Sequence, residues 1–200
     1  MGQYADFHQR SIQDRDAFWA EQAKQIEWHK EPTEICDYSN PPFAKWFKGG
    51  ETNLCHNALD RHLQDRGEQA ALIFVSTETD QEVTYTYRQL HAEVQRMAAS
   101  FLSLGVKKGD RVLIYMPMIA EASFAMLACA RIGAIHSVVF GGFASGSLAS
   151  RIEDASPKLI VSADAGSRGG KVVEYKPLLD EAIRLSAHKP DSVLLVDRGL

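Results

Sequence analysis

The sequence predicts an α/β fold, in which strands and helices alternate around a largely parallel sheet behind a mostly helical or irregular N-terminal extension. From about residue 71 onward, short apolar runs alternate with segments of helical periodicity. Most of these runs are continuously apolar, which is typical of strands covered by helices on both faces. Residues 1–60 differ in composition, because they contain all three tryptophans of the chain. We therefore expect two regions, 1–60 and 61–200.

We interpret the first region as an extension with a structural packing role, and not as an independent domain. Apolar side chains recur on one face of a helix that we place over residues 14–26. Irregular chain anchored by Trp46 and Phe47 should follow as far as Lys48. A second helix should begin at Asn53, a favourable N-cap, and end at Gly67.

The second region opens with a predicted hairpin and a long helix. A buried strand, a turn and an alternating strand are expected over residues 71–75, 77–80 and 83–87. Thr86 and Gln89 have the spacing of a capping box, so a helix should begin there. Gly105 should close this helix.

The rest of the chain alternates regularly between strands and helices. Strands are predicted over residues 111–116, 134–140, 158–161 and 192–196, and helices over 120–131, 147–152 and 175–185. His136 falls inside a strand and is expected in the core. The chain stops soon after the last strand without a covering helix, so we expect it to be the incomplete N-terminal part of a larger domain.

Composition excludes several classes of function. The formal net charge is −4, so the chain as a whole has no electrostatic attraction to nucleic acid or to an anionic membrane. The three cysteines lack disulfide or zinc spacing and are expected as buried thiols in a reducing compartment. No signal peptide or clean membrane span is evident, so we expect a soluble cytoplasmic protein. No Walker A loop, G-x-G-x-x-G fingerprint or metal-ligand spacing occurs, so these residues by themselves predict no metal-binding residue and no particular reaction.

Two glycine-rich loops follow predicted strands, where open α/β sheets bind ligands. In the first, Gly141 and Gly142 would let the backbone approach a flat ligand, and Phe140 could stack on it. In the second, Arg168 and Lys171 could hold a phosphate by hydrogen bonds and charge. The alternatives are a tight turn whose glycines only supply positive φ, and a solvated loop with incidental charge.

Several segments resemble the adenylate-forming enzymes. TYTYRQL at residues 84–90 and LACARIGA at 127–134 resemble core motifs of that superfamily, and IHSVVFGGF at 135–143 resembles its short-chain acyl-CoA synthetases. The similarity covers essentially all 200 residues, including the N-terminal extension. NPPFAKWF at 40–47 and VLLVDRGL at 193–200 resemble the propionyl-CoA synthetases more than the acetyl-CoA synthetases.

The resemblance implies an AMP-forming acid–thiol ligase of the propionate–CoA ligase type. Propionate would attack the α-phosphate of ATP, giving propionyl-adenylate and diphosphate, and the thiol of coenzyme A would then displace AMP. ATP with Mg²⁺ and coenzyme A would serve the complete enzyme. The family's phosphate loop and its later lysine have no counterpart here, so the resemblance implies no catalytic or ATP-binding residue in this chain. These 200 residues alone should therefore be inactive without the C-terminal remainder of the chain.

The resemblance also implies a coenzyme A contact. In acetyl-CoA synthetase relatives, the two basic residues of an Arg-x-x-Arg loop hold its phosphates, and the matching positions are Arg168 and Lys171. The lysine lacks the planar fork of arginine, so this second contact would be a point charge. Phe140, Gly141 and Gly142 match the stretch that lies against the adenine of coenzyme A.

Three other functions stay open. One is part of an acetyl-CoA synthetase, and another is a non-catalytic module that binds a nucleotide or coenzyme A. A complete, well-capped fold would favour the module, whereas exposed apolar residues around Leu194 and Leu195 would favour the partial ligase. A small dehydrogenase-like domain is disfavoured by the missing dinucleotide fingerprint.

Overall fold

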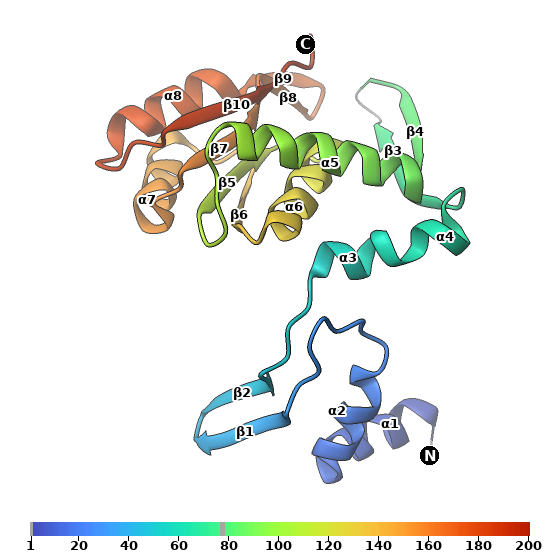
Figure 1. Ribbon diagram of the computed structural model, residues 1–200. Helices are drawn as coiled ribbons and strands as arrows, with labels where there is room; N and C mark the ends of the chain where they lie inside the picture. The colour runs from blue at the N-terminus through green and yellow to red at the C-terminus, as the bar shows by residue number, and fades with distance from the viewer. Residues whose placement is uncertain (1, 77–78) are drawn as a thin grey trace. The chain divides into compact units, whose positions relative to one another are not determined.

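The computed structural model describes residues 2–76 and 79–200 (Figure 1). The chain divides into two compact units, one ending at Asn57 and the other running from Ala58 to Leu200. Part of the turn expected over residues 77–80 lies outside the described residues.

The first unit pairs two helices with a β-hairpin. Its elements are α1 (Gln3–Gln13), α2 (Arg15–Ala23), β1 (Glu34–Asn40) and β2 (Phe43–Lys48). Helix α2 confirms the helix expected near residue 14, but α1, which buries no residue, was not expected. The irregular chain expected as far as Lys48 is wrong. Asn40 faces Phe43 across the two prolines, so the turn signal joins two paired strands.

Aromatic contacts join the helices and the hairpin of this unit. The Phe18 ring is buried and lies 4.7 Å from the Phe7 ring and 5.2 Å from the Trp19 ring. The Trp19 ring in turn lies 5.6 Å from that of Trp46 on β2. Trp46 therefore anchors the segment, as expected, although the segment is a strand.

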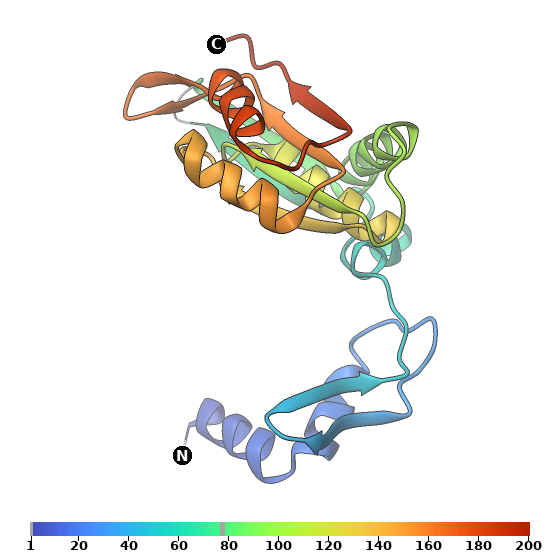
Figure 2. The same cartoon turned by 90° about the vertical axis from the view of Figure 1, so that its left-hand side faces the viewer.

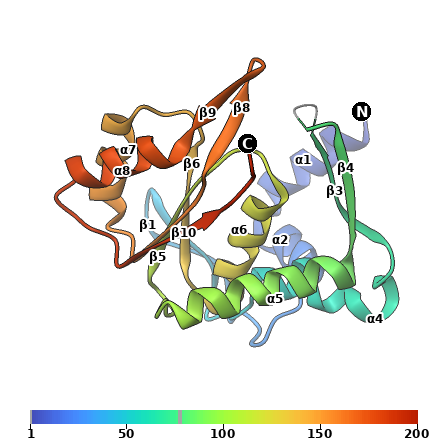
Figure 3. The same cartoon turned by 90° about the horizontal axis from the view of Figure 1, so that it is seen from above.

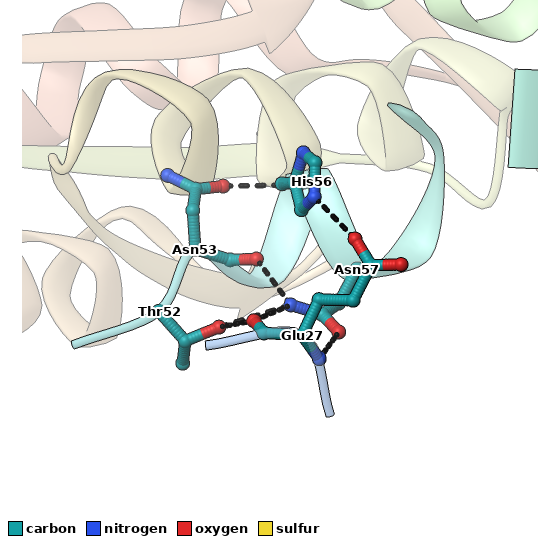
Figure 4. A network of polar contacts seen from close by, with 5 residues as sticks. All are labelled: Glu27, Thr52, Asn53, His56 and Asn57. Atoms are coloured by element: carbon teal, nitrogen blue, oxygen red, sulfur yellow. Dashed lines mark hydrogen bonds and ion pairs between the residues drawn. The ribbon is translucent and has the colours of Figure 1, made fainter. Parts of the chain in front are cut away.

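A polar network closes the end of the first unit (Figure 4). The Glu27 carboxylate lies 2.8 Å from His56 Nε2, and Asn57 Nδ2 donates to Glu27 O and to Thr52 Oγ1. Asn53 Oδ1 accepts the His56 N–H at 3.1 Å, which confirms Asn53 as the cap of α3 (Leu54–Ala58). These contacts hold the segment after α2 against the start of α3.

The second expected helix is broken into three pieces. After α3 come the 3-10 helix η1 (Asp60–His62) and α4 (Leu63–Arg66). Leu59 has φ −127° and ψ −61°, outside the helical range, and its side chain is buried. Asp60 Oδ1 then lies 2.8 Å both from Arg131 Nη2 and from His91 Nε2. The side-chain contacts of Asp60 come from residues far along the chain, so local periodicity could not show the break.

The expected hairpin is confirmed as β3 (Ala70–Ser76) paired with β4 (Gln81–Thr86). The capping box is confirmed as well: Thr86 Oγ1 accepts the Gln89 N–H, and Gln89 Oε1 accepts the Thr86 N–H. It opens helix α5 (Tyr87–Ser103), after which Gly105 has φ 81°. The burial expected for the first strand is wrong for Ile73 and Val75, which are exposed.

The second unit is built on a four-stranded parallel sheet. The strand order is β10 (Ser192–Val196), β7 (Leu159–Ala163), β5 (Arg111–Met116) and β6 (Ile135–Phe140). Helices α7 (Ser145–Ala155) and α8 (Tyr175–Leu185) lie on one side, and α5 and α6 (Ala120–Ile132) on the other (Figure 3). Nearly all side chains of β5 and β7 are buried, so the α/β sheet and the burial of its inner strands are confirmed.

The two edge strands are less buried than the sequence indicated. Ile135, Val138 and Phe140 on β6 are more than half exposed, as is typical where a strand has a neighbour on one side only. His136 is also exposed, so its expected place in the core is wrong. On β10, Leu195 is exposed and Leu194 is half-buried. Apolar surface is therefore present around Leu194 and Leu195.

The second glycine-rich segment is a hairpin rather than a loop. Strands β8 (Ala165–Arg168) and β9 (Lys171–Glu174) pair in antiparallel register and project beside the sheet (Figure 2). Gly169 and Gly170 form its tip with φ of 58° and 75°. Positive φ at both central residues is what a tight two-residue hairpin turn requires. The glycines were recognised in the sequence, but the flanking strands are too short to show a pattern.

Candidate functional site

A cavity of about 530 Å³ opens at the carboxyl ends of the parallel strands. Its lining includes Met116 at the end of β5, Phe140 and Gly141 at the end of β6, and Ser167 on β8. Tyr175 and Arg198 contribute from α8 and from the segment after β10. The bases of both glycine-rich segments therefore meet at one site, at the edge of the sheet where α/β folds bind ligands.

The segment from Phe140 to Phe143 is held at its far end by side chains of the unit. Tyr115 Oη donates to Phe143 O at 3.2 Å, and the Arg151 guanidinium lies 4.4 Å from the centre of the Phe143 ring. Phe140 remains exposed, with its ring 5.9 Å from that of Phe143. An exposed aromatic ring on an anchored backbone could stack on a flat ligand.

Gly141 has a packing reason to be glycine. A Cβ there would lie 2.6 Å from Met116 O and 2.7 Å from Tyr175 Oη, which is too close for any side chain. Gly142 has φ 154°, a value that residues with side chains disfavour. Close approach of the backbone to other protein groups thus accounts for Gly141, whereas the sequence suggested close approach to a ligand or a turn requirement.

Arg168 and Lys171 occupy partner positions across the tip of the β8–β9 hairpin. Lys171 is exposed. The register brings together two positions that are three residues apart in sequence, an arrangement that suits two cations acting on one phosphate.

Asp164 fixes the base of this hairpin. Its Oδ1 accepts the N–H groups of Ala165 at 2.8 Å and of Arg198 at 3.0 Å, and its backbone oxygen accepts the Tyr175 N–H at 2.8 Å. Partial burial acts to raise the pKa of Asp164, but the hydrogen bonds from Arg198 and Ala165 outweigh it and hold that pKa below its ordinary value. A charged Asp164 therefore ties together the ends of β7 and β10 and the start of α8.

Two tyrosines lie behind the site. The rings of Tyr115 and Tyr175 are both buried, with centres 5.1 Å apart. Burial, with a smaller contribution from Tyr175, raises the pKa of Tyr115 to about 12, so this phenol stays protonated and keeps donating to Phe143. The sequence analysis missed Tyr115, Tyr175 and Asp164, because each acts on residues at least ten positions away or on backbone groups that no motif marks.

Cysteine chemistry is not part of this site. Cys36, Cys55 and Cys129 are buried thiols. Burial raises the pKa of the Cys129 thiol to about 12, which leaves it protonated and unreactive near neutral pH.

Metal and membrane sites were also sought. Over residues 2–76 and 79–200, no group of three or more His, Cys, Asp or Glu side chains is placed to hold a metal ion. Within the same ranges, no helix has the length and apolar character needed to cross a membrane.

Comparison with known proteins places the chain in a family. The sequence profile described as "AMP-binding enzyme" matches residues 59–199, and the profile described as "Acetyl-coenzyme A synthetase N-terminus" matches residues 4–58. A curated relative, "Propionate--CoA ligase" of Salmonella typhimurium, is 64% identical over 98% of this chain. Another, "Acetyl-coenzyme A synthetase" of Streptomyces coelicolor, is 51% identical over 97%. The chain spans about a third of their length, 31% and 30% respectively.

A solved structure agrees with this placement. The acetoacetyl-CoA synthetase from Streptomyces lividans superposes with a TM-score of 0.85 at 28% identity, covering 98% of this chain and 32% of that one. The first profile alone accounts for most of the chain, and the fold matches an acyl-CoA synthetase. The chain therefore belongs to the AMP-binding enzyme family.

Proposed function

We propose that this chain forms the N-terminal part of a cytoplasmic short-chain acyl-CoA synthetase that acts on propionate. The observation that carries the proposal is the 64% identity, over nearly the whole chain, to a propionate–CoA ligase. The cavity at the carboxyl ends of the parallel strands supports it, because it offers a place for part of a nucleotide-like substrate.

The reaction has two steps. A propionate oxygen attacks the α-phosphorus of ATP, and the bond from that phosphorus to the bridging oxygen breaks, releasing diphosphate. The sulfur of coenzyme A then attacks the acyl carbon and loses its proton, and AMP leaves with the electrons of the acyl–oxygen bond. Mg²⁺ would accompany ATP, but the described residues offer no cluster for it, so we assign it no ligand in this chain.

We assign the coenzyme A side of the second step to this chain. Arg168 and Lys171, at partner positions of the hairpin tip, would hold the phosphates, and Phe140, beside Gly141 and Gly142, would stack on the adenine. Residues of both segments line one cavity, which supports a single extended ligand that touches both.

We further propose that residues 1–60 form an extension of the acetyl-CoA synthetase type and that residues 61–200 form the first part of the AMP-binding domain. The division of the chain after Asn57 supports this boundary, as does the change of matching profile between residues 58 and 59.

Acetate is the second candidate for the acyl substrate. The description of the N-terminal profile favours it, since that profile is named for acetyl-coenzyme A synthetase. Propionate is preferred, because identity to the propionate–CoA ligase exceeds identity to the acetyl-coenzyme A synthetase, 64% against 51%.

Two chimeras test the proposal. The segment matched by this chain is replaced by residues 1–200 in the Salmonella typhimurium propionate–CoA ligase and in the Streptomyces coelicolor acetyl-coenzyme A synthetase. We expect the first chimera to form propionyl-CoA at a rate comparable with its host and the second to lose most of its activity. A folded but inactive first chimera would favour a non-catalytic binding module, and activity in the second alone would favour acetate.

A further inference from the structure

The buried phenol of Tyr175 lies between the two segments that we assign to coenzyme A. Tyr175 is the first residue of α8 and follows β9 directly, so it belongs to the hairpin end of the site. Its side chain is 4% exposed, and its ring packs on that of Tyr115. A polar group buried this deeply needs a hydrogen-bond partner.

That partner is the backbone of the other segment. Tyr175 Oη donates to Gly141 O at 2.6 Å. The carbonyl group belongs to the residue next to Phe140, whose exposed ring we assign to adenine stacking. The hydrogen bond therefore links the start of α8 to the chain that follows β6.

The same hydroxyl also fills the space beside a second glycine. A Cβ on Gly166 would lie 2.9 Å from Tyr175 Oη and 3.0 Å from Tyr175 Cζ, and a Cβ on Gly141 would lie 2.7 Å from that oxygen. Gly166 lies on β8, two residues before Arg168. One phenol thus sets how closely β8 and the Gly141 backbone approach each other.

We propose that Tyr175 is a positioning residue for coenzyme A: its hydrogen bond to Gly141 O fixes the spacing between the phosphate-holding hairpin and the adenine-stacking segment. This inference rests on the proposed function, because it presumes that both segments contact coenzyme A. A ligand held at both ends loses affinity when either end moves. Loss of the hydrogen bond from Tyr175 to Gly141 should therefore weaken binding of coenzyme A and leave binding of ATP and propionate unchanged.

The test compares Tyr175→Phe with Tyr85→Phe, which removes another phenol hydroxyl from a ring packed on Phe124, 5.3 Å away. The first measurement is amide hydrogen exchange in the 200-residue chain, with folding checked by circular dichroism. Tyr175→Phe should speed exchange in residues 141–143 and 165–174, and Tyr85→Phe should leave both segments unchanged. Unchanged exchange of both segments in Tyr175→Phe would contradict the positioning role of Tyr175.

The second measurement is steady-state kinetics of the propionate–CoA ligase chimera. Tyr175→Phe should raise KM for coenzyme A on the order of fivefold, the effect of one hydrogen bond, with propionate-dependent ATP–diphosphate exchange unchanged. Gly166→Ala should produce the same pattern, because its Cβ would displace the hydroxyl, so the inference does not depend on a single variant.

The outcomes separate this inference from the proposed function. If Arg168→Ala raises KM for coenzyme A and Tyr175→Phe does not, the positioning role is wrong while the site stands. If neither variant alters KM for coenzyme A, the assignment of the site to coenzyme A fails, and the positioning role fails with it, whatever the exchange data show.

Discussion

Arg168 and Lys171 are the residues on which the coenzyme A assignment depends most. They are partner positions across a two-glycine turn, and we propose that both act on one anionic group. The sequence identified both residues because glycines and cations stand out in it. It could not identify their pairing, which arises from strands of only four residues each.

At Arg168, replacement by alanine should weaken binding of coenzyme A selectively. In the propionate–CoA ligase chimera, we expect KM for coenzyme A to rise on the order of tenfold, as for loss of a charged hydrogen bond. Propionate-dependent ATP–diphosphate exchange should stay unchanged, because it precedes coenzyme A. Lys107→Ala, which removes an exposed cation from a turn, is the control. Equal losses in both half-reactions would contradict the assignment.

At Lys171, replacement by arginine should improve the site. Arginine restores a planar fork that can hold a phosphate by two hydrogen bonds, so KM for coenzyme A should fall severalfold in the same chimera. Titration of initial rate against coenzyme A concentration measures it. A higher KM would indicate that Lys171 does not face a phosphate.

At the scale of elements, the inner and edge strands of the sheet contribute differently to the free energy of unfolding. β5 lies between β7 and β6 and is buried along nearly its whole length, whereas β6 has a neighbour on one side only. Continuous apolar sequence predicted both strands equally well. Burial of β6 could not be judged from its own residues, because it depends on what packs beside the strand.

Matched substitutions on these strands should therefore differ in cost. Ile114 on β5 is fully buried, while Ile135 on β6 is 55% exposed. Ile114→Ala should lower the free energy of unfolding by about 2–5 kcal/mol, through lost burial and the cavity left behind. Ile135→Ala should cost less than about 1 kcal/mol. Urea denaturation of the 200-residue chain measures both, and equal costs would mean that β6 is covered in solution.

Local signals explain which elements the sequence predicts well. Strand 111–116, strand 192–196 and helix 175–185 have the bounds expected, and the capping box at Thr86 opens the helix as expected. The hairpin β8–β9 was missed, because its strands have only four residues each. The hairpin β1–β2 was missed although its strands have seven and six residues, because only its turn gave a recognised signal. Tyr175 was missed as a site residue, since its role lies in a contact with Gly141, 34 positions away.

At the scale of the whole molecule, the chain combines a small aromatic-rich unit with an α/β unit that carries the candidate site. It spans about a third of the length of the relatives it matches. The features assigned to coenzyme A lie within it, whereas no phosphate loop for ATP was recognised in its sequence. We therefore propose that this chain serves the coenzyme A half-reaction and that adenylate formation depends on the rest of the enzyme.

Propionate-dependent ATP–diphosphate exchange, measured side by side on the folded 200-residue chain and on the propionate–CoA ligase chimera, tests that separation most directly. We expect exchange by the chimera and none by the chain alone. Exchange by the chain alone would contradict it, because a complete adenylation site would then lie within these residues. Failure of a folded chimera to catalyse exchange would contradict the proposed ligase function itself.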